Sequence, residues 1–105
     1  MRIQHLDQHV NFQPEKFGRS VVFSTDTAAQ FMYTFQPGQA MTEHTHPFSA
    51  EYLMVLEGEA QISVGTESVL AEVNSVVLVL PEEVHAIHNH GSEPLVVLSF
   101  MSPKP

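Results

Sequence analysis

Apolar and polar residues alternate in short runs along most of the chain, with turn-forming residues between the runs at roughly ten-residue spacing from residue 20 onward. No segment has the periodicity of a long amphipathic helix. Pairs such as Pro37-Gly38, Gly65-Thr66 and Asn74-Ser75 are typical of turns between strands. The pattern predicts strands over residues 21–24, 29–36, 39–46, 51–56, 59–64, 68–71, 76–80, 85–89 and 94–101.

Strands of this length and spacing predict an all-β fold, either an antiparallel sandwich or a barrel. Closing such a sheet on itself removes exposed edges and leaves an interior that can hold one small ligand. The 105 residues are predicted to form one domain, over residues 1–105. Residues 1–20 are less regular and predict an N-terminal arm, in which Pro14–Gly18 could form one helical turn with Pro first and Gly last.

Three histidines and a glutamate form the most informative pattern in the chain. His44 and His46 are separated by one residue, so on a strand both side chains point to the same face. Glu51 follows a predicted turn at residues 47–50, and His85 comes from a later strand. Such side chains are costly to bury unless they are paired or bind a metal. They predict a metal site; the alternative is an ordinary polar face of an exposed strand.

Three imidazole nitrogens and one carboxylate oxygen suit one divalent transition metal. Fe, Mn, Ni, Co, Cu and Zn all fit, and the ligand types do not select among them. If the ion is octahedral, four protein ligands leave two positions for water, substrate or oxygen. The predicted site therefore permits catalysis without requiring it.

The spacing from Gly38 to Gly58 is G-x5-H-x-H-x4-E-x6-G. It resembles motif 1 of the cupin superfamily, and the resemblance extends from about residue 30 to residue 101. It implies a small single-domain cupin of the conserved-barrel type, with an antiparallel jelly-roll β-barrel, or double-stranded β-helix. It also implies that the metal ligands are His44, His46, Glu51 and His85.

The second cupin motif, G-x5-P-x-G-x2-H-x3-N, is present in altered form. His85 and Asn89 keep the H-x3-N spacing, but Asn74 stands in place of the first glycine and Glu82 or Glu83 in place of the second. Asn is the residue that best tolerates the left-handed conformation after Gly. Two alternatives remain for the altered turn: it delivers His85 to the metal, or it displaces this ligand.

Aromatic and methionine side chains in the predicted strands are each expected first of all in the barrel core; if several of them line the pocket instead, the ligand is partly apolar. Tyr33 is the candidate catalytic acid or base, because Tyr52 follows Glu51 and is expected to face away. His88 is also expected to point outward, on the opposite face from His85.

The formal net charge of −8, with four Lys plus Arg, argues against partners such as nucleic acid or anionic membranes. No apolar run approaches the roughly 20 residues that span a bilayer. Arg2, Lys16, Arg19 and Lys104 all lie outside the predicted strands. A strongly anionic substrate such as a sugar phosphate is therefore expected to lack a counter-charge other than the metal.

The N-terminus has no apolar signal segment and the chain has no cysteine, and both features favour a cytoplasmic protein. Outer strands rich in Val and Phe predict a homodimer, since closed two-fold dimers are the commonest oligomers.

No cysteine nucleophile, G-x-S-x-G motif or phosphate-binding loop is present, so the metal is the only reactive centre that the sequence offers. We expect a metal-dependent enzyme of dioxygenase or isomerase/lyase type that acts on a small, partly apolar organic molecule. The alternative is a non-catalytic module that binds or senses a small ligand. An enzyme needs an open metal position that faces a cavity, whereas protein closes a structural site.

Overall fold

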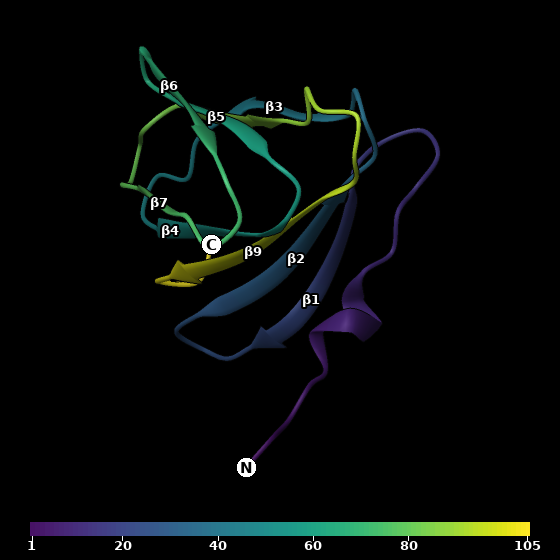
Figure 1. Cartoon of the computed structure of the whole chain (residues 1–105). Coiled ribbons are helices and arrows are strands. Elements are labelled where there is room, and N and C mark those ends of the chain that lie inside the picture. The colour runs from purple at the N-terminus through teal and green to yellow at the C-terminus, as the bar shows by residue number, and fades with distance from the viewer.

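The computed structural model describes all of residues 1–105 and consists of two antiparallel sheets that face each other (Figure 1). The five-stranded sheet has the order β1-β2-β9-β4-β7, and the four-stranded sheet has the order β3-β8-β5-β6. The all-β jelly-roll prediction is confirmed, with a strand at each predicted place. The elements are η1 (Leu6–His9), β1 (Gly18–Ser24), β2 (Ala29–Phe35), β3 (Ala40–His44), β4 (Ala50–Glu57), β5 (Ala60–Val64), β6 (Glu67–Ala71), β7 (Val76–Val79), β8 (His85–His88) and β9 (Leu95–Ser102).

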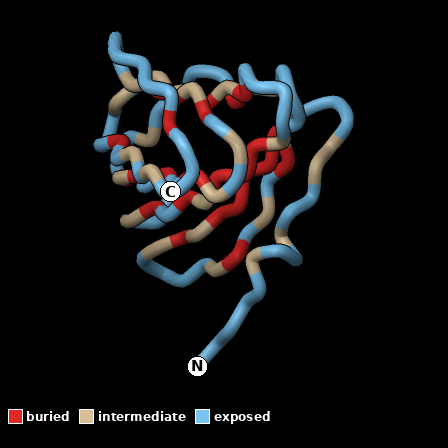
Figure 2. The backbone as a smooth tube through the Cα atoms, in the orientation of Figure 1, coloured by how far each residue is buried: buried red, intermediate tan, exposed pale blue.

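The core lies between the two sheets, because successive residues of a strand point alternately inward and outward. In β4, Leu53 and Val55 are fully buried, whereas Tyr52 and Met54 are exposed. Leu53 and Val55 belong to one apolar cluster that also contains Ile62 from the opposite sheet. Figure 2 shows the buried residues concentrated in the strands. Burial of each large apolar side chain contributes about 1.5–3 kcal/mol.

The N-terminal arm differs from the prediction. Its helical turn is a 3-10 turn at Leu6–His9 and not at Pro14–Gly18, and β1 already begins at Gly18. A Cβ atom at Gly18 would overlap the Asn11 backbone oxygen and Thr34 Oγ1. This glycine therefore marks close packing of the arm against β2, not a helix end. No helix in the chain has the length and apolar character needed to cross a membrane.

The central strand β9 and its neighbours β2 and β4 each direct one polar side chain into the barrel. Ser99 pairs with Phe31 of β2 and with Leu53 of β4. Directly paired residues share a face of the sheet, and so do residues two positions apart on one strand. Tyr33 and Glu51, two positions from these partners, therefore point inward on the same face as Ser99. All three are buried.

Candidate metal centre

The four predicted ligands lie together in the structure. His44 is the last residue of β3, Glu51 is in β4 and His85 is the first residue of β8. His46 lies in the loop after β3, because this strand is shorter than predicted. One candidate ligand atom from each residue lies within 4.8 Å of the others. This group of four, called the ligand cluster below, could hold a metal ion.

The altered turn does not displace His85. Glu82 has a φ of 71°, the left-handed conformation that the motif glycine would supply. Its backbone N–H donates to the carbonyl oxygen of His46 at 2.9 Å, which connects the turn to the first ligand loop. His44 and His85 are direct partners in the β3–β8 ladder, and their ring centroids are 4.2 Å apart. Of the two alternatives, the structure has His85 within the ligand cluster.

Backbone carbonyl groups orient two of the imidazole rings. His44 Nδ1 lies 2.8 Å from the carbonyl oxygen of Thr42, and His85 Nδ1 lies 3.0 Å from that of Glu83. A carbonyl oxygen can only accept, so each Nδ1 carries the hydrogen. In the neutral ring, Nε2 then keeps its lone pair for a metal.

The Glu51 carboxylate is buried and divided between two sets of partners. Its Oε2 accepts hydrogen bonds from the Ser99 hydroxyl at 2.5 Å and from the Tyr33 hydroxyl at 3.4 Å. Its Oε1 lies 3.1 Å from His85 Nε2 and 3.6 Å from His46 Nε2. Ser99 and Tyr33 therefore hold the carboxylate with Oε1 turned towards the histidines.

His46 Nε2 is the one buried side-chain polar atom that has no hydrogen-bond partner. An unsatisfied buried group of this kind costs about 1–3 kcal/mol. Its neighbours are a carboxylate oxygen and two further imidazoles, and three nitrogens with one oxygen form a donor set typical of divalent transition metals. The residues present therefore fit the ion that the sequence predicts.

Burial and hydrogen bonding act in opposite directions on the acidity of the cluster. Burial alone raises the pKa of Glu51, but hydrogen bonds from His85 and Ser99 outweigh it and hold the pKa below its ordinary value. Burial lowers the pKa of His85, but hydrogen bonds to Glu51 and to the Glu83 backbone raise it by more. Burial prevails at His46, so its pKa is lowered. The metal-free cluster thus favours an ionised Glu51, a protonated His85 and a neutral His46.

Tyr33 stays a neutral phenol over the physiological range. Burial, followed by the nearby Glu51 carboxylate, raises its pKa far above the ordinary value. The hydroxyl is therefore a hydrogen-bond donor to Glu51 and not a phenolate base.

The ligand cluster is open on one side. His44 and His46 line a hollow of about 320 Å³ together with Tyr33 and Arg19. Arg19 pairs with Tyr33 in the β1–β2 ladder. The prediction that no basic residue lies in a strand is therefore wrong, and the cause is the early start of β1 at Gly18. The ligand cluster therefore has a positively charged side chain beside the hollow.

A cupin domain model matches residues 31–101 of this sequence. The chain belongs to the cupin family. Among curated proteins, this cupin is similar to the tetracenomycin polyketide synthase protein TcmJ of Streptomyces glaucescens, with 39% identity over 67 residues. The matched part is 64% of this chain and 45% of TcmJ, so the cupin spans less than half of that relative.

Two solved structures resemble the cupin over nearly its whole length. The protein TT1209 from Thermus thermophilus has a TM-score of 0.96 and 28% identity, and the match covers 100% of both chains. A protein with a double-stranded beta-helix domain from Klebsiella pneumoniae subsp. pneumoniae has a TM-score of 0.91 and 28% identity, over 98% of this chain and 90% of that one. Both support the fold described above.

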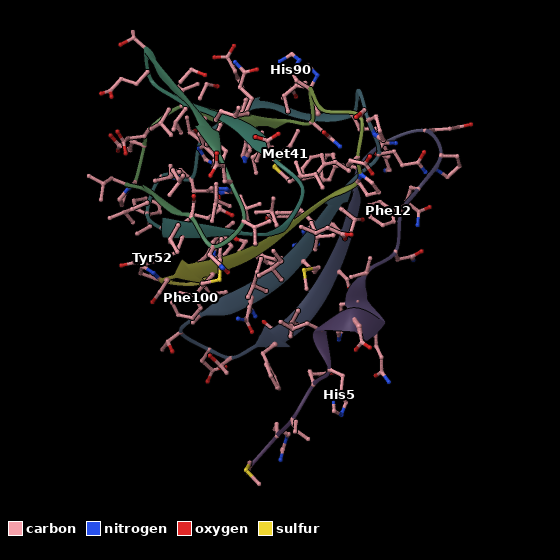
Figure 3. All side chains as sticks on the ribbon, in the orientation of Figure 1. His5, Phe12, Met41, Tyr52, His90 and Phe100 are labelled. Carbon is pink, nitrogen blue, oxygen red and sulfur yellow. The ribbon has the colours of Figure 1, made fainter.

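The remaining predicted residues lie outside the ligand cluster. His88 points away from it, with its ring centroid 3.7 Å from that of His90, which lies at the outer side of the four-stranded sheet (Figure 3). Asn89 is buried, and its Nδ2 donates to the carbonyl oxygens of Phe35 and Glu93. Asn89 therefore closes a turn.

Two residues of the site were not found by sequence reasoning. Ser99 is the single polar residue in the apolar run Leu95–Met101, and that isolation is the signal that could have indicated a buried role. Arg19 follows Gly18, whose local sequence indicates a helix end and not the start of a strand.

Proposed function

We propose that this cupin is a metal-dependent enzyme whose ligands are His44, His46, Glu51 and His85. The ion is one divalent transition metal, among Fe, Mn, Ni, Co, Cu and Zn. The observation that carries the proposal is His46 Nε2, which is buried without a partner and lies 3.6 Å from Glu51 Oε1. A bound cation would give His46 Nε2 the partner that it lacks and would give Glu51 Oε1 a further one.

The proposed reaction is of dioxygenase or isomerase/lyase type. A bound metal would supply Lewis-acid or redox chemistry at coordination positions that the protein leaves free. Ser99 holds the Glu51 carboxylate in place, and Tyr33, which lines the hollow as a neutral phenol, is the candidate acid. Phe17 and Met41 also line this hollow and favour a partly apolar organic substrate. The similarity to a protein named for polyketide synthesis also favours a small organic molecule.

The alternative, a non-catalytic module that binds or senses a small ligand, differs from an enzyme in the access to the metal. A purely structural site would be closed by protein on all sides. The hollow beside His44 and His46 argues against such a closed structural site.

The experiment that tests the proposal is elemental analysis of the protein purified without added metal or chelator. We expect about one equivalent of a transition metal, as at other sites with this donor set, and its loss in His44→Ala and His85→Ala. His88→Ala is the matched control, because His88 faces away from the cluster and should keep the metal. A parent protein that stays metal-free after incubation with each of the six ions would contradict the proposal.

We further propose that the cupin is a cytoplasmic homodimer. The outer side of the five-stranded sheet exposes an uncharged apolar face in which Tyr52 pairs with Phe100 and with Leu78 (Figure 3). Exposed apolar patches of this kind mark interfaces, and a second copy offers the same uncharged surface. The mass in solution should be that of a dimer, and Phe100→Glu should give monomers. A monomeric parent protein would contradict the dimer.

A further inference from the structure

We propose that Arg19 gives the active site a second anchor, which binds the carboxylate of a small organic anion while another oxygen of the same molecule binds the metal. This inference rests on the proposed metal centre and specifies the class of its substrate. The substrate is then a monocarboxylate with a separate metal-binding oxygen, and not a neutral molecule.

Arg19 is positioned at the open side of the ligand cluster. It lies on the inward face of β1 opposite Tyr33, and it lines the same hollow as His44 and His46. Its guanidinium carbon lies 4.1 Å from the centre of the Phe31 ring. A guanidinium over an aromatic ring is attracted by the ring's negative face, which restricts an otherwise flexible side chain. The charge is thus held beside the cluster.

The Arg19 guanidinium has no acidic partner within the protein. The structure contains two ion pairs, and both join a histidine to Glu51. This lack of a partner is notable in a chain with 12 acidic residues and four Lys plus Arg. An arginine that is restrained by a ring and faces a hollow, yet unpaired in an acidic protein, can bind an external anion.

The guanidinium geometry and the hollow favour a carboxylate. The planar fork of arginine matches a carboxylate with two parallel hydrogen bonds. A single guanidinium balances one negative charge, which is the charge of one carboxylate at the end of the ligand that lies away from the metal. The hollow of about 320 Å³ lies at the lower end of the range for ligand sites, roughly 300–1,000 Å³, so the anion is small.

Two matched probes test this inference. The monohydroxamate of succinate and its primary amide have the same metal-binding hydroxamate and differ only in the charge of the far end. Each is titrated calorimetrically into the zinc-loaded parent protein, after a first titration with zinc alone. We expect the carboxylate probe to bind about three- to fivefold more tightly than the amide, because the bidentate pair is charge-assisted but Arg19 is exposed and solvent weakens the pair.

Two variants with the same change in net charge separate local from long-range effects. Arg19→Gln should still bind zinc, and the two probes should bind to it equally. In Lys16→Gln, whose side chain is also exposed but does not line the hollow, the preference for the carboxylate probe should remain. Arg19→Lys keeps the charge without the fork and should keep part of the preference. Thermal unfolding of each variant confirms that it is folded.

The outcomes distinguish the two proposals. A parent protein that binds zinc and both probes with equal affinity would overturn the role of Arg19 and leave the metal centre intact. A preference that survives in Arg19→Gln would overturn it as well. Failure of the parent protein to bind zinc in the first titration would refute the metal centre itself, and the inference would then fail with it.

Discussion

The ligand cluster has an inner half and an outer half, and the two differ in how the protein holds them. Glu51 and His85 are 2% and 1% exposed, and hydrogen bonds engage both. The side chain of His46 is 21% exposed, its Nε2 has no partner, and with His44 it faces the hollow. The inner half is therefore part of the folded core. The outer half is less buried, is held by fewer hydrogen bonds, and is open to a ligand.

The largest expected effect is a difference in stability between the two halves without metal. Glu51→Ala leaves the hydroxyls of Ser99 and Tyr33 without their acceptor and should lower the free energy of unfolding by about 2–4 kcal/mol. His44→Ala should lower it by less than about 1 kcal/mol, because it removes a partly exposed ring. Urea unfolding in the presence of a chelator measures both. Equal losses of stability in the two variants would mean that the inner and outer halves contribute equally to the folded core.

The second effect concerns the two hydroxyls that hold Glu51. Ser99→Ala should weaken metal binding by about 10–100-fold, as expected for a residue that orients a ligand. Tyr33→Phe should weaken it less, because the Tyr33 bond is 3.4 Å long and the Ser99 bond is 2.5 Å. Ser63→Ala, on a strand of the opposite sheet, is the control. Competition against a chromophoric chelator gives the metal affinities. A larger effect for Tyr33→Phe would mean that Tyr33, and not Ser99, is the main residue that orients Glu51.

The members of the ligand cluster could be predicted from the sequence, because they lie at characteristic spacings; their division into an inner and an outer half could not. His44, His46 and Glu51 lie within one motif and His85 within a second, and strand alternation correctly predicts that Tyr52 and His88 point outward. Ser99 could not be predicted, because its partner Glu51 is 48 residues away and the contact depends on the β4–β9 register. A long-range register is a tertiary property that no local pattern contains.

The position of Arg19 could not be predicted from the sequence for a different reason. Its role depends on where an edge strand begins, and the first residue of β1 is Gly18, a residue that is common at helix ends and turns. The steric reason for glycine, contact with Asn11 and Thr34, exists only in the folded chain. The interpretation that the barrel lacks a basic residue followed from this one boundary.

A third effect concerns the proton that occupies the inner half when metal is absent. His85 Nδ1 donates to the Glu83 carbonyl, and Nε2 lies 3.1 Å from Glu51 Oε1, so Nε2 must also carry a proton to avoid contact between two acceptors. The raised pKa of His85 agrees with this. Metal binding should therefore release a proton at pH values below that raised pKa, and affinity should rise with pH up to it, by at most about tenfold per pH unit.

Calorimetry in two buffers of different ionisation enthalpy counts this proton. At pH 6.5, the ordinary pKa of a histidine, the raised pKa keeps His85 more than half protonated, so metal binding should release more than half a proton from it. His88→Ala should behave as the parent does. Metal binding without net proton release at the same pH would mean that His85 is already neutral, and the inner half would then lack the protonated pair described here.

The smallest effect concerns the turn that connects the two halves. Glu82 adopts a φ of 71°, which is strained for a residue with a Cβ, and its N–H donates to the carbonyl oxygen of His46 in the outer half. Glu82→Gly should raise the free energy of unfolding by about 0.5–1 kcal/mol. Glu82→Ala removes the same charge but keeps the Cβ, so it should give no such gain. A gain in both variants would assign the effect to charge and not to backbone strain.

The effect of Glu82→Gly on metal affinity then decides what the strain does. Glycine releases strain but also loosens the unbound turn, which leads into His85 and holds the loop of His46. If stability rises and affinity is unchanged, the turn only connects the strands. If affinity falls while stability rises, the strained glutamate keeps the two halves at binding distance, and the departure from the motif glycine contributes to the metal site.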